Sequence, residues 1–341
     1  MGQALSAGLR AGLAKLNVPV ELSTPLTGLI VEHDRVVGVE TETGPIRATR
    51  GVLLASGGFE RNERMRKEYQ QAPIGVEWTV GAVENTGDGI DAGMRLGAAV
   101  AVMDDAWWGP SIMLPRGPYF CLAERSLPGC ILVNGKGLRF VNEAAPYVDA
   151  VHAMYDNEAV PAWLVADQRY RNSYLFAGLA PRQPMPGRWY KAGAVFRAPD
   201  LAELADRIGV PADALQATVA RFNGFAATGH DDDFGRGASA YDRYYGDPRN
   251  RPNPNLAALS RPPFYAVRIV PGDLGTKGGL RTDARARVLR PDGSVIAGLY
   301  AAGNASGAVM GHSYAGAGST LGPAMTFGYV AAQDIAAAPT G

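Results

Sequence analysis

The sequence has very few of the residues that build covalent or metal-bound scaffolds. Only two cysteines, Cys121 and Cys130, and four histidines occur among its 341 residues, and there is no Cys-x-x-Cys pair. This scarcity excludes a disulfide framework and argues against a zinc centre. We therefore predict no metal site and a reducing compartment, which places the protein in the cytoplasm.

The sequence also lacks an excess of charge and long apolar runs. Its 33 basic and 33 acidic residues give a net charge of zero, so no overall field attracts nucleic acid or an anionic membrane. Arg10 and Lys15 interrupt the apolar pattern at the N-terminus, which argues against a signal peptide, and no uncharged run reaches the length of a membrane span. We expect a soluble protein that has no integral membrane segment and binds no nucleic acid.

Glycine, in contrast, is abundant and unevenly distributed. The 43 glycines concentrate at 57–58, 87–97, 272–279 and 303–322. Such clusters permit a close approach of the backbone to another molecule, because no Cβ stands in the way. In an α/β protein the molecule approached in this way is often a nucleotide.

The character of the sequence changes twice along the chain. Patterns of strands and glycine fill residues 1–104 and return at 279–341, whereas residues 105–278 are richer in Trp, Tyr and Pro. This order predicts an α/β protein (α+β overall). A Rossmann-like nucleotide-binding domain would be formed by 1–104 and 279–341, and a catalytic domain, 105–278, would be inserted into it.

Hydrophobic periodicity and turn residues predict the individual elements. In the first part of the chain we expect a helix over 3–16, a strand over 18–22, a hairpin turn at His33-Asp34-Arg35, a buried strand within 51–58, and a loop and helix over 85–98 capped by Asn85, Thr86 or Asp88. Further along we expect a hairpin around Asn134-Gly135, a helix over 211–229 with Leu215, Val219 and Phe222 on one face, and a helix over about 322–337 that starts near Gly322-Pro323.

Three glycine-rich segments are candidate binding elements. Gly57-Gly58 follows a buried strand, where bare backbone can approach a phosphate or a ring edge. Asn85-Thr86-Gly87-Asp88 opens a helix, whose free N–H groups and positive dipole end attract an anion. Gly303-Asn304 ends a strand and leads into the run 311–322, and a helix follows. An ordinary turn and simple helix capping are the alternatives for the first two segments.

Together these segments resemble the flavoprotein superfamily that includes fumarate reductase and the 3-ketosteroid dehydrogenases. The resemblance covers nearly the whole chain and includes TGDGI at 86–90, LRFVNE at 138–143 and GLYAAGNASG at 298–307. Two features are similar to the 3-ketosteroid Δ1-dehydrogenases within it. The run YAGAGSTLGP at 314–323 matches their Tyr-x-Gly-x-Gly-x-x-x-Gly-Pro, and NEAAPY at 142–147 matches their Asn-Glu-x-x-Pro-Tyr.

The resemblance implies the 1,2-dehydrogenation of a 3-ketosteroid, as in steroid catabolism, with FAD as the cofactor. In the family a tyrosine hydroxyl and a glycine N–H polarise the ketone, and Tyr314 and Gly318 match them; Tyr147 matches the base that removes the C2 proton. The C1 hydride goes to the flavin, which an external electron acceptor reoxidises. The implied cofactor-binding residues are Gly57, Gly58, Asn85, Thr86, Gly87, Asp88, Gly303, Asn304, Ser319, Leu321 and Pro323.

The sequence departs from the family in one respect. The family begins with a strand and a Gly-x-Gly-x-x-Gly turn that holds the FAD pyrophosphate, and no such fingerprint occurs here. A second tyrosine that supports the base in the family would lie in the same part. The FAD-binding domain is therefore expected to be partial. A misassigned start, a truncated gene and a separate polypeptide that supplies the N-terminal portion are the three explanations left open.

Two other functions are also left open. A reductase of another unsaturated substrate would carry an arginine clamp for a dicarboxylate, and Arg139 and Arg236 lie outside the glycine-rich run. A non-catalytic fragment without flavin is the third possibility. Trp107 and Trp108 fit a steroid pocket and core packing equally well, and we expect His230–Asp233 to form a solvated loop and not a metal site.

Overall fold

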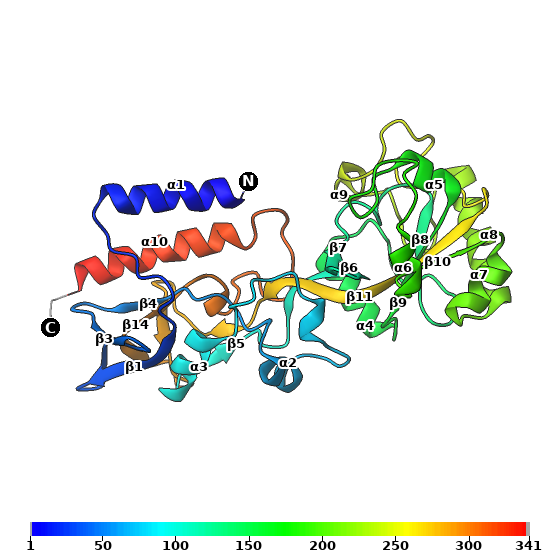
Figure 1. Ribbon diagram of the computed structural model, residues 1–341. Helices are drawn as coiled ribbons and strands as arrows, with labels where there is room; N and C mark the ends of the chain where they lie inside the picture. Colours follow the sequence, from blue (N-terminus) through cyan, green and yellow to red (C-terminus); the bar gives the residue numbers. More distant parts are fainter. Residues whose placement is uncertain (1, 339–341) are drawn as a thin grey trace.

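The computed structural model describes residues 2–338, which form two lobes joined by extended strands (Figure 1). The first lobe holds a sheet of six strands: β1 (Leu26–Glu32), β2 (Arg35–Thr41), β3 (Gly44–Arg47), β4 (Val52–Leu54), β13 (Arg287–Leu289) and β14 (Val295–Ala301). The strand order is β1-β2-β14-β13, with β3 beside β2 and β4 beside β14. β14 runs parallel to β2 and β4, and it runs antiparallel to β13.

The second lobe is built on an antiparallel sheet. Its strands are β6 (Ala106–Leu114), β7 (Gly117–Phe120), β8 (Cys130–Val133), β9 (Ala162–Asp167), β10 (Val195–Ala198) and β11 (Phe264–Thr276). Their order is β7-β6-β11-β9-β8, and β10 also pairs with β11. A separate two-stranded ladder joins β5 (Val100–Ala101) to β12 (Gly279–Leu280).

The helices cover these sheets. The first lobe has α1 (Gly2–Lys15), α2 (Glu63–Tyr69), α3 (Asp88–Arg95) and α10 (Leu321–Ala337), with the 3-10 turns η1 (Val76–Trp78) and η2 (Gly303–Ala305). The second lobe has α4 (Tyr147–Asp156), α5 (Gln168–Ser173), α6 (Gly187–Lys191), α7 (Leu201–Ile208), α8 (Ala212–Thr228) and α9 (Ala240–Tyr244). No helix within residues 2–338 has both the length and the apolar composition needed to cross a lipid bilayer.

Strand periodicity gives the second lobe two apolar cores, one on each face of its sheet. Alternate side chains of a strand point to opposite faces. Leu132 and Leu164 therefore join the core that α4 covers, whereas their neighbours Val133 and Val165 join the core that α7 and α8 cover. Both faces are buried, which fixes the register of each strand because a slip by one residue would exchange the two sets.

Two antiparallel strands carry the chain between the lobes. The chain enters the second lobe in β6 and returns in β11, and these strands pair from Ile112↔Ile269 to Ala106↔Thr276 (Figure 1). Asp105, just before β6, and Lys277, just after β11, thus lie side by side at the junction, where the Lys277 N–H donates to the Asp105 carbonyl at 3.1 Å. This junction positions the candidate site.

Several local predictions are confirmed. His33 and Asp34 form the two-residue turn between β1 and β2, with φ of +49° and +57° at the two turn positions. The strand predicted within 51–58 is β4, although only its last residue, Leu54, is fully buried. α8 buries the predicted face, Leu215, Val219 and Phe222. The mixture of helices and sheets agrees with the predicted fold class.

Other local predictions, of one strand, two helix starts and one hairpin, are wrong. Residues 18–22 form no strand; Val18, Val20 and Leu22 are exposed there. The N-cap of α3 is Gly87, with φ of +83° and no side-chain cap, and not Asn85, Thr86 or Asp88. α10 begins at Leu321, just before the expected start near Gly322-Pro323, so that Pro323 is its third residue and not its first. In place of the predicted hairpin around Asn134-Gly135, the structure has a single β-bridge between Val133 and Arg139.

A buried ionic cluster joins two segments of the second lobe. Arg139 bonds to Glu143 and Asp231 at 2.8 Å each, and Arg236 bonds to Glu143 at 3.0 Å. Burial by itself raises the pKa of Glu143, but the charges of Arg139 and Arg236 outweigh it and hold this pKa below its ordinary value. Asp231 is only 5% exposed, so the prediction of a solvated loop is wrong at this residue.

Glu143→Gln is expected to lower the free energy of unfolding by about 3–5 kcal/mol, because it leaves two buried arginines without their shared carboxylate. Urea denaturation followed by circular dichroism measures the change. Glu32→Gln, which removes the charge of the exposed Arg47–Glu32 pair, is the control and is expected to cost less than about 1 kcal/mol. Equal losses in the two variants would contradict this account of the cluster.

Candidate active site

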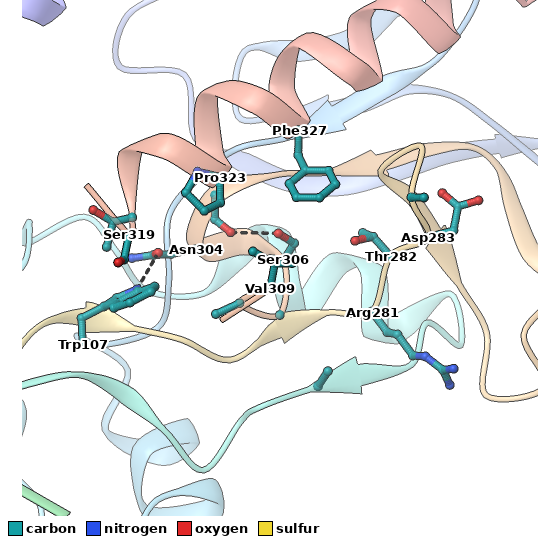
Figure 2. A pocket seen from close by; sticks show the side chains of 16 residues that line it. Trp107, Arg281, Thr282, Asp283, Asn304, Ser306, Val309, Ser319, Pro323 and Phe327 are labelled. Carbon is teal, nitrogen blue, oxygen red and sulfur yellow. Dashed lines mark hydrogen bonds between the residues drawn. The ribbon is translucent and has the colours of Figure 1, made fainter. Parts of the chain in front are cut away.

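Two adjoining cavities lie at the N-terminal end of α10. One, of about 350 Å³, contains both candidate tyrosines and is called the tyrosine cavity; the other, of about 360 Å³, is called the Phe327 cavity and is drawn in Figure 2. The two cavities share Trp107, Gly303, Asn304, Ser319 and Thr320. Residues from both lobes therefore line one continuous region of the structure.

Tyr147 is held at the start of α4. It is the first residue of this helix, after Pro146, and only 8% of it is exposed. The preceding turn is fixed by Arg125, whose Nη1 donates to the carbonyls of Glu143 at 2.5 Å and Ala145 at 2.6 Å. The phenol ring therefore projects from a rigid turn of the second lobe into the tyrosine cavity.

Tyr314 comes from the glycine-rich run of the first lobe and meets Tyr147 in this cavity. The hydroxyl of Tyr147 donates to the hydroxyl of Tyr314, and the two ring centres are 4.4 Å apart. Burial raises the pKa of Tyr147 well above its ordinary value, and the hydrogen bond with Tyr314 raises it further. Both effects favour the protonated phenol at neutral pH.

Gly318 lies in the same cavity and presents bare backbone. Its φ is +96°, and no atom lies within 4 Å of the place where a Cβ would stand. Gly316, with a φ of +120°, is equally open. These positive φ angles suit glycine, and the open space beside them can admit another molecule against the main chain.

The two tryptophans have different roles. The Trp107 Nε1 donates to the Asn304 Oδ1 at 3.1 Å, and this indole lines both cavities (Figure 2). Trp108 instead belongs to the core of the second lobe, where its Nε1 donates to the Asp105 Oδ1 at 2.6 Å. The cavity interpretation therefore fits Trp107, and the core interpretation fits Trp108.

The N-terminus of α10 borders both cavities. Thr320, Leu321 and Ala324 line the tyrosine cavity, while Thr320, Pro323 and Phe327 line the Phe327 cavity (Figure 2). The first N–H groups of a helix have no partner within it, and the helix dipole makes this end partly positive. In α10 the Gly322 N–H already donates to the Gly318 carbonyl at 2.8 Å and Pro323 has no N–H, so it is the helix dipole that favours a ligand atom with negative charge here.

The other predicted cofactor residues divide into two sets. Gly57 lines the tyrosine cavity, and the Asn85 side chain lies directly behind it. Gly58 and Gly87 are instead surrounded by protein, because a Cβ would lie 2.1 Å from the Thr276 Oγ1 at Gly58 and 2.9 Å from the Met65 sulfur at Gly87. Thr86 and Asp88 bond to each other at the start of α3 and line neither cavity.

Sequence reasoning missed several buried polar residues behind this region. Glu60 is fully buried and accepts a hydrogen bond from the Asn85 Nδ2 at 2.6 Å; burial raises the pKa of its carboxyl. Asp105 and Lys277 form a buried ion pair at 2.7 Å. The only signal for Glu60 was its place directly after Gly57-Gly58-Phe59, and an isolated Asp or Lys gives no signal of burial.

The arginines considered for a dicarboxylate clamp are engaged elsewhere. Arg139 and Arg236 both bond to Glu143 in the buried cluster of the second lobe. Neither is among the residues that line the tyrosine cavity. Within residues 2–338, no three His, Cys, Asp or Glu side chains gather in a way that would hold a metal ion.

Comparison with known proteins identifies similar chains. Residues 1–321 match the family model described as FAD binding domain. The chain is 57% identical to the 3-oxosteroid 1-dehydrogenase of Mycolicibacterium smegmatis, over 99% of this chain and 62% of that protein, and 58% identical to that of Mycobacterium tuberculosis, over 98% and 63%. The chain therefore spans less than two thirds of the length of these relatives.

A solved structure is also similar. It is the crystal structure of 3-ketosteroid delta1-dehydrogenase from Sterolibacterium denitrificans in complex with 1,4-androstadiene-3,17-dione, with a TM-score of 0.95 and 47% identity. The match covers 99% of this chain and 63% of that chain. These findings confirm the predicted family resemblance, the flavoprotein fold class and FAD as the cofactor of the family.

Gly57→Ala is expected to destabilise the protein more than Gly44→Ala. Both residues have positive φ, which costs an alanine about 1–3 kcal/mol. A Cβ at Gly57 would also lie 2.4 Å from the Asn85 Oδ1, whereas a Cβ at Gly44 meets nothing. Displacing Asn85 from Glu60 adds about 1–3 kcal/mol. Urea denaturation measures both variants, and similar midpoints would refute the close packing behind Gly57.

Proposed function

We propose that this chain, which belongs to the FAD binding domain family, acts in the FAD-dependent 1,2-dehydrogenation of a 3-ketosteroid. The observation that carries the proposal is the meeting of Tyr147 and Tyr314, hydroxyl to hydroxyl, in one cavity with Gly318. The names of the similar enzymes give the substrate class. An oxidoreductase acting on a CH–CH bond beside a ketone is the activity that this site supports best.

The shape and donor set of the two cavities fit a flavin. Gly57, Gly303 and Gly318 line the tyrosine cavity with bare backbone, and a Cβ on Gly318 would meet no protein atom within 4 Å. Asn304 and Ser319 are polar residues shared by the two cavities. We propose that these residues and the N-terminus of α10, including Leu321 and Pro323, hold FAD. Gly58, Asn85, Thr86, Gly87 and Asp88 would support that site from behind.

The two tyrosines can have different roles at the ketone, one as a hydrogen-bond donor and one as a base. The Tyr314 O–H and the Gly318 N–H would donate to the ketone oxygen, which gains negative charge as the C2 proton leaves. Each donor of this kind contributes on the order of 3 kcal/mol to transition-state stabilisation. Tyr147, once ionised to the phenolate, would accept the C2 proton and become the neutral phenol.

The remaining chemistry belongs to the cofactor and to a further partner. When bound, FAD accepts the C1 hydrogen as a hydride. We propose that an external electron acceptor then takes the two electrons, because the two cysteines are free thiols, which cannot accept electrons. Cys121 and Cys130 are both buried in the second lobe. The free, reduced state of these cysteines supports the proposed cytoplasmic location.

We also propose that the chain divides into two domains at the limits predicted from the sequence. A flavin-binding domain would comprise residues 1–104 and 279–341, and a catalytic domain would comprise 105–278. The ends of β6 and β11 at Ala106 and Thr276 support these limits, because the chain crosses between the lobes beside them.

A dicarboxylate reductase is the less favoured function. It requires a cationic clamp, and no arginine is among the residues that line the tyrosine cavity. The purified flavoprotein, given 4-androstene-3,17-dione and an artificial electron acceptor, is expected to form the 1,4-diene. Reduction of fumarate without steroid turnover would support the reductase instead, and a colourless, inactive protein would support a non-catalytic fragment.

Tyr147→Phe and Tyr314→Phe are each expected to lower kcat at least about 100-fold, because one loses the base and the other loses an oxyanion donor. Bound FAD is expected to stay unchanged, which the flavin absorbance measures. Tyr329→Phe, on an exposed tyrosine of α10, is the matched control. Rates near that of the unsubstituted enzyme in either cavity variant would refute the assigned roles.

The rate of steroid oxidation is expected to rise with pH. Burial and the hydrogen bond with Tyr314 raise the pKa of Tyr147, which places the whole working pH range below that pKa. In this range the fraction of phenolate grows about tenfold for each pH unit. Log kcat should therefore climb with a slope near one over roughly pH 6–9. Stopped-flow measurement of flavin reduction at several pH values tests this. A flat profile would show that the base does not ionise in this way.

A further inference from the structure

The backbone of the glycine-rich run that carries Tyr314 has few contacts outside the run, and of its side chains His312 pairs with Asp104 at 2.9 Å on the exposed surface. At Gly311, Gly316 and Gly318 a Cβ would meet no atom within 4 Å. The described hydrogen bonds of the backbone over 311–320 are local turns, with one exception: the Ser313 carbonyl accepts a bond from the Lys277 Nζ at 3.2 Å. The residue next to Tyr314 is thus anchored from outside the run by one buried side chain.

Lys277 is unusually fixed for a lysine. None of its side chain is exposed, and its Nζ bonds to the Asp105 Oδ2 at 2.7 Å and lies 5.0 Å from the centre of the Trp107 ring. Its main-chain carbonyl accepts the N–H of Ala308 at 2.9 Å. Lys277 therefore holds the segment leading to Tyr314 at two points, one through its backbone and one through its ammonium group.

Asp105 ties this lysine to the segment that carries the other tyrosine. Its Oδ1 pairs with the His152 Nε2 at 2.9 Å, and His152 lies on α4, whose first residue is Tyr147. The Trp108 Nε1 donates to the same oxygen at 2.6 Å. Burial raises the pKa of Asp105, but the hydrogen bonds from His152 and Lys277 outweigh it, so the carboxyl stays ionised.

We propose that Lys277, held by Asp105, is the positioning residue that places Tyr314 against Tyr147. The inference rests on the proposed function and adds a residue to it. Lys277 is absent from the residues that line the tyrosine cavity, so it acts through the Ser313 carbonyl and not on the substrate. A donor displaced by about 1 Å can lose on the order of 100-fold in rate, which sets the size of the expected effect.

The test is a double-mutant cycle in the FAD-loaded enzyme. Lys277→Met is expected to lower kcat about 100-fold in the unsubstituted enzyme, but less than about 3-fold in the Tyr314→Phe background, where there is no hydroxyl left to position. The same cycle is measured on the affinity for 1,4-androstadiene-3,17-dione, from the change that this ligand causes in the flavin absorbance. Equal losses in both backgrounds would overturn the proposal.

Two further variants keep the test decisive. Lys136→Met, on a lysine whose side chain is 74% exposed, is the matched control and should leave both measurements unchanged. Lys277→Met leaves the buried Asp105 carboxylate without its cationic partner. If that variant fails to fold, the double variant Asp105→Asn/Lys277→Met replaces it, because it removes both charges together. This double variant still lacks the bond to Ser313, so its kcat should stay low. Full recovery of kcat would overturn the proposal.

The cycle also separates this inference from the function on which it rests. If the unsubstituted enzyme does not oxidise the steroid, the proposed function fails, while the binding measurements still report whether Lys277 acts through Tyr314. If the enzyme is active and the two substitutions are additive in both measurements, the function stands and the positioning role fails.

Discussion

The pairing of β6 with β11 is the constraint on which the site depends. These strands carry the chain between lobes, and they end beside each other at Asp105 and Lys277, whose buried charges compensate one another. A buried charge without a partner is costly, so the junction has one favourable arrangement. Tyr147 belongs to one lobe and Tyr314 to the other, and this junction lies between the elements that carry them.

Local sequence signals predicted the elements whose stability is local. The turn at His33-Asp34 needs only two residues that tolerate positive φ, and α8 needs only one apolar face, so both were found. Residues 18–22 also alternate, but a strand requires a neighbour, and in the described structure they have none. Pairing across the chain, as between β4 and β14, is a tertiary property that a single segment does not encode.

The candidate site was predicted through resemblance and not through physical patterning. Tyr147 and Tyr314 are 167 residues apart in sequence, and only the family motifs around them marked them among 14 tyrosines. Lys277 and Glu60 carry no such motif, and a charged residue is ordinarily expected at the surface. Their burial depends on contacts with residues distant in sequence, Asn85 and Thr276 for Glu60 and Asp105 for Lys277, which a single segment does not reveal.

The hydrogen bond between the two tyrosines has a thermodynamic consequence for ligand choice. Tyr314 is the acceptor in that bond, so its own O–H is free to donate to a ketone; the ketone exchanges a hydrogen bond with water for one with the tyrosine, which yields little net free energy. Affinity must then come from apolar surface removed from water, at about 25 cal/mol per Å². A small ring ketone has little such surface to offer, whereas a fused polycyclic ketone has several times more. In the proposed function, a ligand held by this tyrosine pair would therefore owe most of its affinity to its hydrocarbon body and little to its carbonyl end.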